Sequence, residues 1–151
     1  MSSTDSERDG GSTLGTLIRM AHAAMVEEYT RWLGTTSYNN IQPAHAAVIQ
    51  PLWQCPEGAR LTELAHSARI TKQSMGALVD SLENGGYVER VEDPDDRRAS
   101  RVCLTARGRR FARDARAFAR ELETRLAERI GTRRLEELRI ALELLLTSTR
   151  S

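Results

Sequence analysis

The sequence contains little of several residue types, and each scarcity excludes a class of protein. Only two of its 151 residues are cysteines, Cys55 and Cys103, and neither belongs to a CxxC pair or a zinc-ligand pattern. We therefore expect two free thiols in a reducing compartment and no disulfide scaffold. No apolar run approaches the ~18 residues of a membrane span, and the polar N-terminus lacks the apolar segment of a secretory signal. A cytoplasmic protein without membrane association is expected.

Motifs for catalysis and for cofactor binding are also missing. The three histidines, His22, His45 and His66, have neither HExxH nor H-x₃₋₅-H spacing. The chain contains no GxSxG, P-loop or GxGxxG motif. We therefore expect no enzymatic activity, no bound metal and no cofactor.

Lysine occurs once, as Lys72, among 22 basic residues. The net charge of +1 argues for no particular partner, but the charges are unevenly distributed. Residues 60–120 carry 13 basic and 9 acidic residues, whereas the rest of the chain carries 9 basic and 12 acidic ones. The middle of the chain is thus electropositive, as a module that binds nucleic acid requires.

Apolar residues recur at helical spacing before this basic region. They predict a helix over residues 14–33 that Gly34 ends. A second helix is predicted to begin at Pro43, and Pro51 is expected to kink or end it. Residues 1–12 are rich in Ser, Thr, Asp and Gly and are expected to form a disordered tail.

Two more helices are predicted after the basic region, within residues 106–148, with Gly131 between them. Their apolar stripes, like that of residues 13–33, are longer than a small module can cover. We therefore expect these helices to form a homodimer, and residues 13–151 to form one domain.

Residues 61–104 predict two short helices followed by a two-stranded ribbon. Thr62 is expected to cap the first helix, and Thr71 is expected to cap the second by accepting from the Ser74 amide. Strands are predicted over 87–92 and 100–104, with the turn EDPDDRRAS between them. This arrangement predicts a winged helix-turn-helix over about residues 43–105, in a mainly α fold with a two- or three-stranded β-wing.

The predicted second helix offers side chains that suit a DNA major groove. A glutamine forms a bidentate pair with adenine, a serine reaches either kind of base edge, and an alanine methyl contacts a thymine methyl. A lysine suits a phosphate. A solvated helix face is the alternative to this interpretation. The predicted DNA contacts on this helix are Thr71, Lys72, Gln73, Ser74, Gly76 and Ala77.

Arg97 and Arg98 lie near the tip of the predicted wing. An arginine at a loop tip suits a narrow, A·T-rich minor groove, so both are predicted DNA contacts. An aspartate beside these arginines is expected to orient a guanidinium and not to contact DNA. A hairpin turn with a local surface ion pair is the alternative.

The chain resembles the MarR family of bacterial transcription regulators. The resemblance rests on LTELA, ITKQSMGALVDSLENGGYVER, DPDDRR and VCLTARG. The family signature falls on Asp96, Arg98, Leu104, Thr105 and Gly108. It implies that Arg98 is the wing-tip arginine and that Asp96 orients its guanidinium. The resemblance implies an obligate homodimer that binds a pseudo-palindromic operator and, commonly, a repressor that a small phenolic or lipophilic ligand releases. Gly76 and Ala77 depart from the Ser/Thr and Arg that are frequent in relatives, so this helix is expected to make fewer base contacts.

The resemblance also implies an effector site between the dimer helices and the winged module. The candidates there are His22, Trp32, His45 and Trp53, although His45 can instead bond a backbone carbonyl. Two further hypotheses stay open. One is a redox-sensing regulator that uses Cys55 or Cys103, and the other is a winged-helix module that binds protein.

Overall fold

The computed structural model of the chain describes residues 11–148. In chain order its elements are α1 (Leu14–Leu33), η1 (Pro43–His45, a 3-10 turn), α2 (Ala46–Gln54), α3 (Leu61–Ala68), α4 (Lys72–Asn84), β1 (Val88–Asp93), β2 (Asp96–Leu104), α5 (Ala106–Ile130) and α6 (Thr132–Ser148). The prediction of a mainly helical fold with a small β-wing is confirmed. Most of the tail predicted over residues 1–12 lies outside the described residues.

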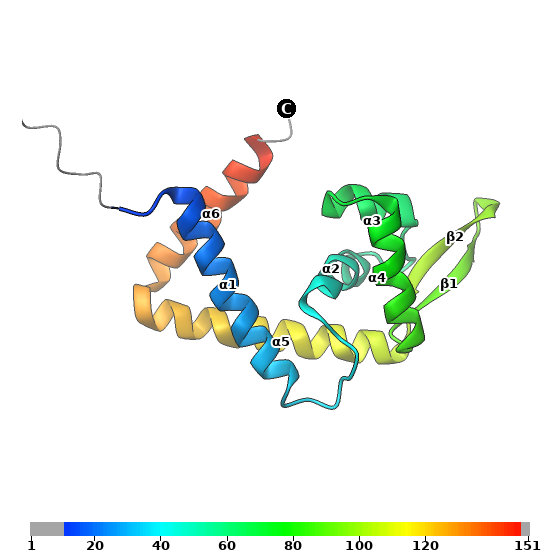
Figure 1. Cartoon of the computed structure of the whole chain (residues 1–151), viewed down its shortest axis with the longest axis horizontal. Helices are drawn as coiled ribbons and strands as arrows, with labels where there is room; N and C mark the ends of the chain where they lie inside the picture. The colour runs from blue at the N-terminus through cyan, green and yellow to red at the C-terminus, as the bar shows by residue number, and fades with distance from the viewer. Residues whose placement is uncertain (1–10, 149–151) are drawn as a thin grey trace, which may run out of the picture.

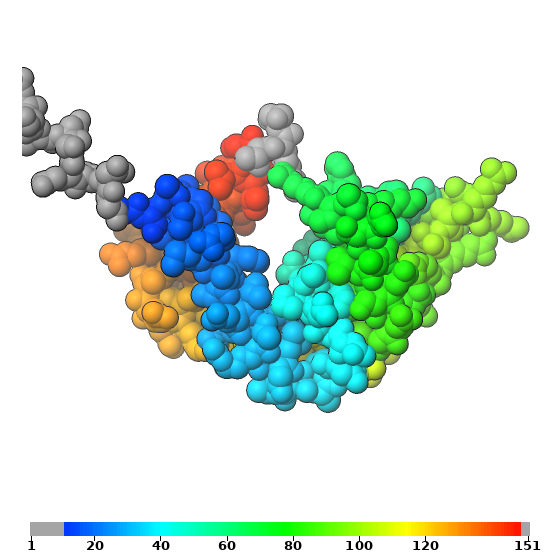
Figure 2. Space-filling model, viewed as in Figure 1, coloured from blue at the N-terminus to red at the C-terminus, as the bar shows by residue number. Residues whose placement is uncertain are grey.

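The helices and the hairpin divide into two parts that α5 connects (Figure 1). The helices α2, α3 and α4 pack with the β1–β2 hairpin into one winged module, and the first half of α5 runs along its base. Most of α1 and all of α6 lie on the other side of an open space (Figure 2). The module holds nearly all the buried side chains, whereas α6 has none.

Threonine N-caps begin three of the helices. Thr71 Oγ1 accepts from the Ser74 amide at 3.0 Å, and Thr105 Oγ1 accepts from the Gly108 amide at 3.1 Å. The cap predicted at Thr71 is therefore confirmed. At the other end of α4, Gly86 has a φ of +78°, a conformation that glycine adopts without strain.

The cap predicted at Thr62 is wrong. The N-cap of α3 is Arg60, and the helix already begins at Leu61. The Glu63 carboxylate accepts from the Arg60 amide at 2.8 Å, so the hydrogen bond that caps the helix forms at Arg60, two residues before Thr62.

The helix predicted from Pro43 is divided, and it does not end at Pro51. A 3-10 turn over Pro43–His45 precedes α2, because the His45 ring accepts from the Gln42 amide and tightens this turn. Pro51 lies inside α2, which continues to Gln54. Burial of Leu52 in the core offsets the hydrogen bond that proline cannot make.

The wing has a shorter turn and a longer second strand than predicted. Strand β2 begins at Asp96, so Arg97 and Arg98 lie in a strand and not in the turn. The Asp93 carboxylate accepts from the Asp95 amide at 2.9 Å and closes the turn within two residues. The register shifts between Glu92 and Asp93, and from there the two strands stay paired as far as Val88↔Leu104. An isolated bridge between Ala59 and Val102 adds a short third strand segment to this sheet.

Tyr87 and Phe111 are the largest fully buried side chains of the core. Their rings meet edge to face with centroids 5.7 Å apart, and Tyr38 meets Phe111 in the same way at 5.1 Å. Gly108 allows α5 to approach, because a Cβ atom at this position would overlap the carbonyl oxygen of Tyr87. Tyr87 therefore lies at the joint between the end of α4 and the start of α5.

Candidate nucleic-acid interface and ligand cavity

One face of α4 is packed and the other is open to solvent. Met75, Val79 and Leu82 are buried, whereas all but one of the residues predicted to contact DNA are exposed. Gly76 is half-buried, and its Cα faces Leu61 of α3. The hydroxyl of Thr71 donates to Ser74 Oγ at 2.9 Å, which leaves the Ser74 proton available for an acceptor. The exposed members of the predicted set are Thr71, Lys72, Gln73, Ser74 and Ala77.

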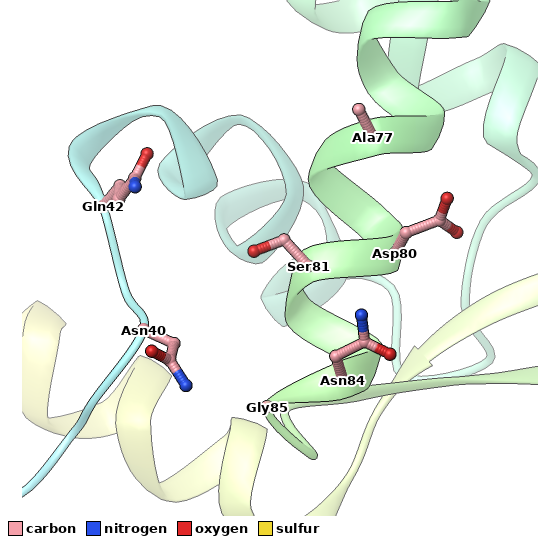
Figure 3. A pocket seen from close by; sticks show the side chains of 7 residues that line it. All are labelled: Asn40, Gln42, Ala77, Asp80, Ser81, Asn84 and Gly85. Atoms are coloured by element: carbon pink, nitrogen blue, oxygen red, sulfur yellow. The ribbon is translucent and has the colours of Figure 1, made fainter.

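A polar groove that the sequence did not indicate lies beside the C-terminal half of α4. It has a volume of about 540 Å³ and is open to solvent. Figure 3 shows Ala77, Ser81 and Asn84 on α4, with Asn40 and Gln42 on the opposite wall. The spacing of 77, 81 and 84 places these α4 residues on one stripe, a signal that helical periodicity alone could have supplied.

The wing tip presents both predicted arginines to solvent. Arg97 has a side-chain exposure of 94%, and its Nε lies 4.0 Å from Glu92, a weak surface pair. The tip of the hairpin and the N-terminal end of α4 point to the same side of the molecule (Figure 1). The predicted role of Asp96 needs correction. Its carboxylate accepts from the backbone amide of Arg98 at 3.0 Å and shapes the chain there, not the guanidinium.

Asp93 organises the turn of the wing, a role that the sequence did not reveal. Its side chain is fully buried and accepts from Arg60 Nε at 2.7 Å, while Arg101 Nε lies 3.3 Å away without hydrogen-bond alignment. The bond from the Asp95 amide and then the Arg60 guanidinium lower the pKa of this carboxyl. Asp93 therefore joins the turn to the start of α3 as an anion.

We predict that Asp93→Asn lowers the melting temperature more than Asp95→Asn does. Asparagine keeps an acceptor for the residue 95 amide but removes the buried charge that holds Arg60 and Arg101. Thermal unfolding compares the two variants, and hydrogen exchange at the amides of residues 97–100 should quicken only in Asp93→Asn. Equal behaviour of the two variants would contradict this role of Asp93.

Arg90 ties the wing to α4. Its guanidinium pairs with Asp80 at 2.7 Å and also with Glu83, both on α4. These contacts raise the pKa of Arg90, chiefly through the Asp80 bond. Strand β1 and the C-terminal half of α4 are therefore linked by charge as well as by packing.

A largely apolar cavity of about 310 Å³ lies between α1, α2 and α5. Of the four residues predicted for an effector site, His22 and Trp53 line it together, and Arg116 lies over the Trp53 ring at 5.2 Å. Trp32 does not line the cavity but stacks at 5.0 Å on Phe118, which does. Other lining residues include Met25, Val26, Tyr29, Ile49, Phe111, Ala115 and Leu122.

His45 is buried outside the cavity, with 2% exposure. Its Nδ1 accepts from the Gln42 amide at 2.9 Å, so the bond runs from a backbone N–H and not to a carbonyl as the sequence suggested. Burial lowers the pKa of this ring, which is therefore neutral in the folded chain.

The neutral His45 ring predicts acid sensitivity. Because the folded pKa lies below the unfolded value, the stabilisation is complete above pH ~6.5 and is lost as pH falls through the folded pKa. His45→Asn keeps an acceptor for the Gln42 amide but cannot titrate, so its melting temperature should fall less between pH 7 and pH 5. The exposed His66 offers a matched His66→Asn control. A pH dependence unchanged by His45→Asn would refute the prediction.

The cysteine environment does not favour redox sensing. Cys103 Sγ donates to the carbonyl oxygen of Glu57 at 3.6 Å, and burial followed by the nearby Glu89 carboxylate raises its pKa. A raised pKa lowers the fraction of reactive thiolate. Within residues 11–148 no cluster of His, Cys, Asp and Glu could hold a metal ion, and no helix has the length and apolarity to cross a membrane.

Comparison with known proteins adds the family. Residues 56–99 match the family model described as MarR family. The HTH-type transcriptional repressor Rv2887 of Mycobacterium tuberculosis is 34% identical over 95 residues, which cover 63% of this chain and 68% of the relative.

Two solved structures agree with this chain over nearly their full length. The transcriptional repressor CouR, bound to a 23-mer DNA duplex, superposes with a TM-score of 0.72 at 28% identity, covering 92% of this chain and 93% of that one. Rv2887 in complex with salicylic acid superposes with a TM-score of 0.67 at 29% identity, covering 90% and 98%. The segment that matches the family model contains α4 and most of the wing, and the fold agrees with that of the family. The chain belongs to the MarR family of transcription regulators.

Proposed function

We propose that this chain is a homodimeric transcriptional repressor that acts in the cytoplasm, binds a pseudo-palindromic operator and is released by a small aromatic effector. The observation that carries the proposal is that the N-terminal end of α4 and the tip of the hairpin point to the same side of the molecule, and that both carry exposed polar and basic side chains. CouR, which has the same fold, is a repressor bound to DNA. The activity proposed is binding and not catalysis.

The side chains on the proposed DNA surface divide by role. Gln73 and Ser74 meet base edges in the major groove, while Gly76 and Ala77 allow close approach. Lys72 neutralises a phosphate, and Thr71 positions the start of the helix. Arg97 and Arg98 enter the adjacent minor groove, where the potential is most negative.

The proposed dimer face is the exposed apolar surface of α1 and α6. Contiguous apolar patches of this kind mark interfaces in soluble proteins. In a two-fold dimer, two copies of α4 meet successive major grooves about 34 Å apart. Residues 13–33 and 106–148 are thus proposed as dimerisation helices, around a winged helix-turn-helix of about 43–105. The exposed side chains include Leu14, Leu17, Met20, Met25, Leu138, Ile140, Leu142, Leu144 and Leu145.

The cavity between α1, α2 and α5 is the proposed effector site. Aromatic walls from Tyr29, Trp53 and Phe111 suit a planar ring, and Arg116 supplies positive charge at the rim. Salicylic acid, present in the Rv2887 complex, is an aromatic carboxylate of this kind. The effector would favour a separation of the two α4 helices that no longer fits successive grooves.

Selection of bound fragments from a random DNA pool tests the proposal in one step. The full chain should enrich a pseudo-palindrome whose half-sites lie about 10 bp apart. Its affinity for that site should fall steeply with salt, through counterion release, and should fall on addition of salicylate. Failure to enrich any sequence would overturn the operator assignment. DNA binding that does not change with salt concentration would instead favour a module that binds protein.

A further inference from the structure

Arg107, the second residue of α5, contacts two other parts of the chain. Its Nη1 donates to the carbonyl oxygen of Gly85 at 2.9 Å, at the C-cap of α4. Its Nη2 donates to Asn39 Oδ1 at 2.9 Å and to the Tyr87 hydroxyl at 3.1 Å. The guanidinium carbon lies 4.5 Å from the centre of the Tyr87 ring. One side chain thus joins α5 to the end of α4 and to the linker between α1 and α2.

The acceptors of Arg107 are all neutral. Within residues 11–148, no carboxylate forms an ion pair with it. The half-buried guanidinium supplies a hydrogen-bond donor to the C-terminus of α4, where carbonyl groups lack donors and carry partial negative charge. The planar guanidinium suits this task, because it holds its donors in fixed directions, whereas the donors of a lysine ammonium rotate.

Neighbouring contacts make the joint stiff. Thr105 Oγ1 donates to the carbonyl oxygen of Gly86 at 2.6 Å, and the Tyr87 hydroxyl donates to the carbonyl oxygen of Asn39 at 2.9 Å. A Cβ atom on Gly85 would lie 2.8 Å from the Tyr87 ring, so the end of α4 rests directly on that ring. The angle between α4 and α5 is therefore set by a few contacts around Arg107.

We propose that Arg107 is the positioning residue that sets the separation of the two recognition helices in the dimer, and with it the half-site spacing the protein accepts. The proposal rests on the function proposed above. Helix α5 leads from this joint to the dimer face, and its 25 residues span about 37 Å. A small rotation at the joint therefore moves α4 by several ångströms, comparable to the ~3.4 Å rise of one base pair. The proposal gives Arg107 no contact with DNA.

The test measures the affinity of the full chain for the selected operator, for operators with one base pair added or removed between half-sites, and for a duplex with a single half-site. The wild-type chain should prefer the selected spacing about tenfold or more. Arg107→Lys and Arg107→Met should lose most of this preference yet keep the single half-site affinity and the dimer mass. Arg110→Met, one turn away on an exposed position, is the matched control and should keep the preference.

The outcomes separate the two proposals. If the wild-type chain binds no DNA sequence selectively, the proposed function fails before Arg107 is at issue. If Arg107→Lys and Arg107→Met retain the wild-type spacing preference, or lose affinity equally for the single half-site, Arg107 has no positioning role. Should both variants fail to fold, Asn39→Ala removes one Arg107 anchor from an exposed residue and must itself relax the preference. Unchanged spacing discrimination in Asn39→Ala would then overturn the proposal.

Discussion

A chain that carries both Leu138→Arg and Leu145→Arg should be monomeric and should bind the operator about 10²–10⁴-fold more weakly than the wild type. A monomer contacts one half-site only and loses the gain in affinity that comes from linking two DNA-binding modules. Both leucines are large apolar side chains of α6, with exposures of 49% and 44% in the single chain. Arginines there would have to lose their hydration inside the proposed dimer face. Light scattering gives the mass, and a gel-shift titration gives the affinity.

Glu143→Arg is the matched control for this variant. It lies on the same helix, is exposed, and changes the net charge by the same amount as the two leucine replacements. It should remain dimeric and keep its operator affinity. A dimer that survives both arginines in α6 would show that the chain associates through another surface.

Replacing the wing arginines should weaken operator binding while leaving the dimer intact. Arg98→Gln should cost about 1–3 kcal/mol of binding free energy if its guanidinium reads the minor groove, and Arg97→Gln tests its neighbour separately. Neither guanidinium has a close partner within the described residues that would hold it away from DNA. A variant that loses only a phosphate contact should weaken binding to all sequences alike and reduce the salt slope by about one.

The control for the wing is Arg120→Gln, which removes an exposed arginine from α5, outside the winged module. Its affinity should match that of the wild type. Affinities for operator DNA that are identical among Arg97→Gln, Arg98→Gln and Arg120→Gln would exclude the wing from the interface. The three measurements together distinguish a local contact from a general loss of positive charge.

Several parts of the fold depend on neighbours in the sequence, and these were predictable. The Thr71 cap needs only a hydroxyl three residues before a free amide, and Gly86 supplies a positive φ at the end of α4. The exposed polar face of α4 follows from the period of its apolar residues. The motifs that carry the family resemblance lie in the same continuous stretch.

Other features depend on residues far apart in the chain, and no local pattern in the sequence marks them. Among four effector candidates, composition could not separate His22 and Trp53, which share a cavity, from Trp32 and His45, which pack elsewhere. An aspartate in a turn looks the same in sequence whether it orients a guanidinium or, like Asp96, bonds an amide.

The sequence by itself determined the caps that begin α4 and α5, which face of α4 is polar, and the family to which the chain is similar. Each of these depends on side chains and amides within about one helical turn. Only the tertiary structure decided that Asp93 is buried against Arg60 and that Arg107 holds Gly85 and Asn39. These contacts join segments separated by 33, 22 and 68 positions, and a charge meets such partners only when the packed core has brought them together.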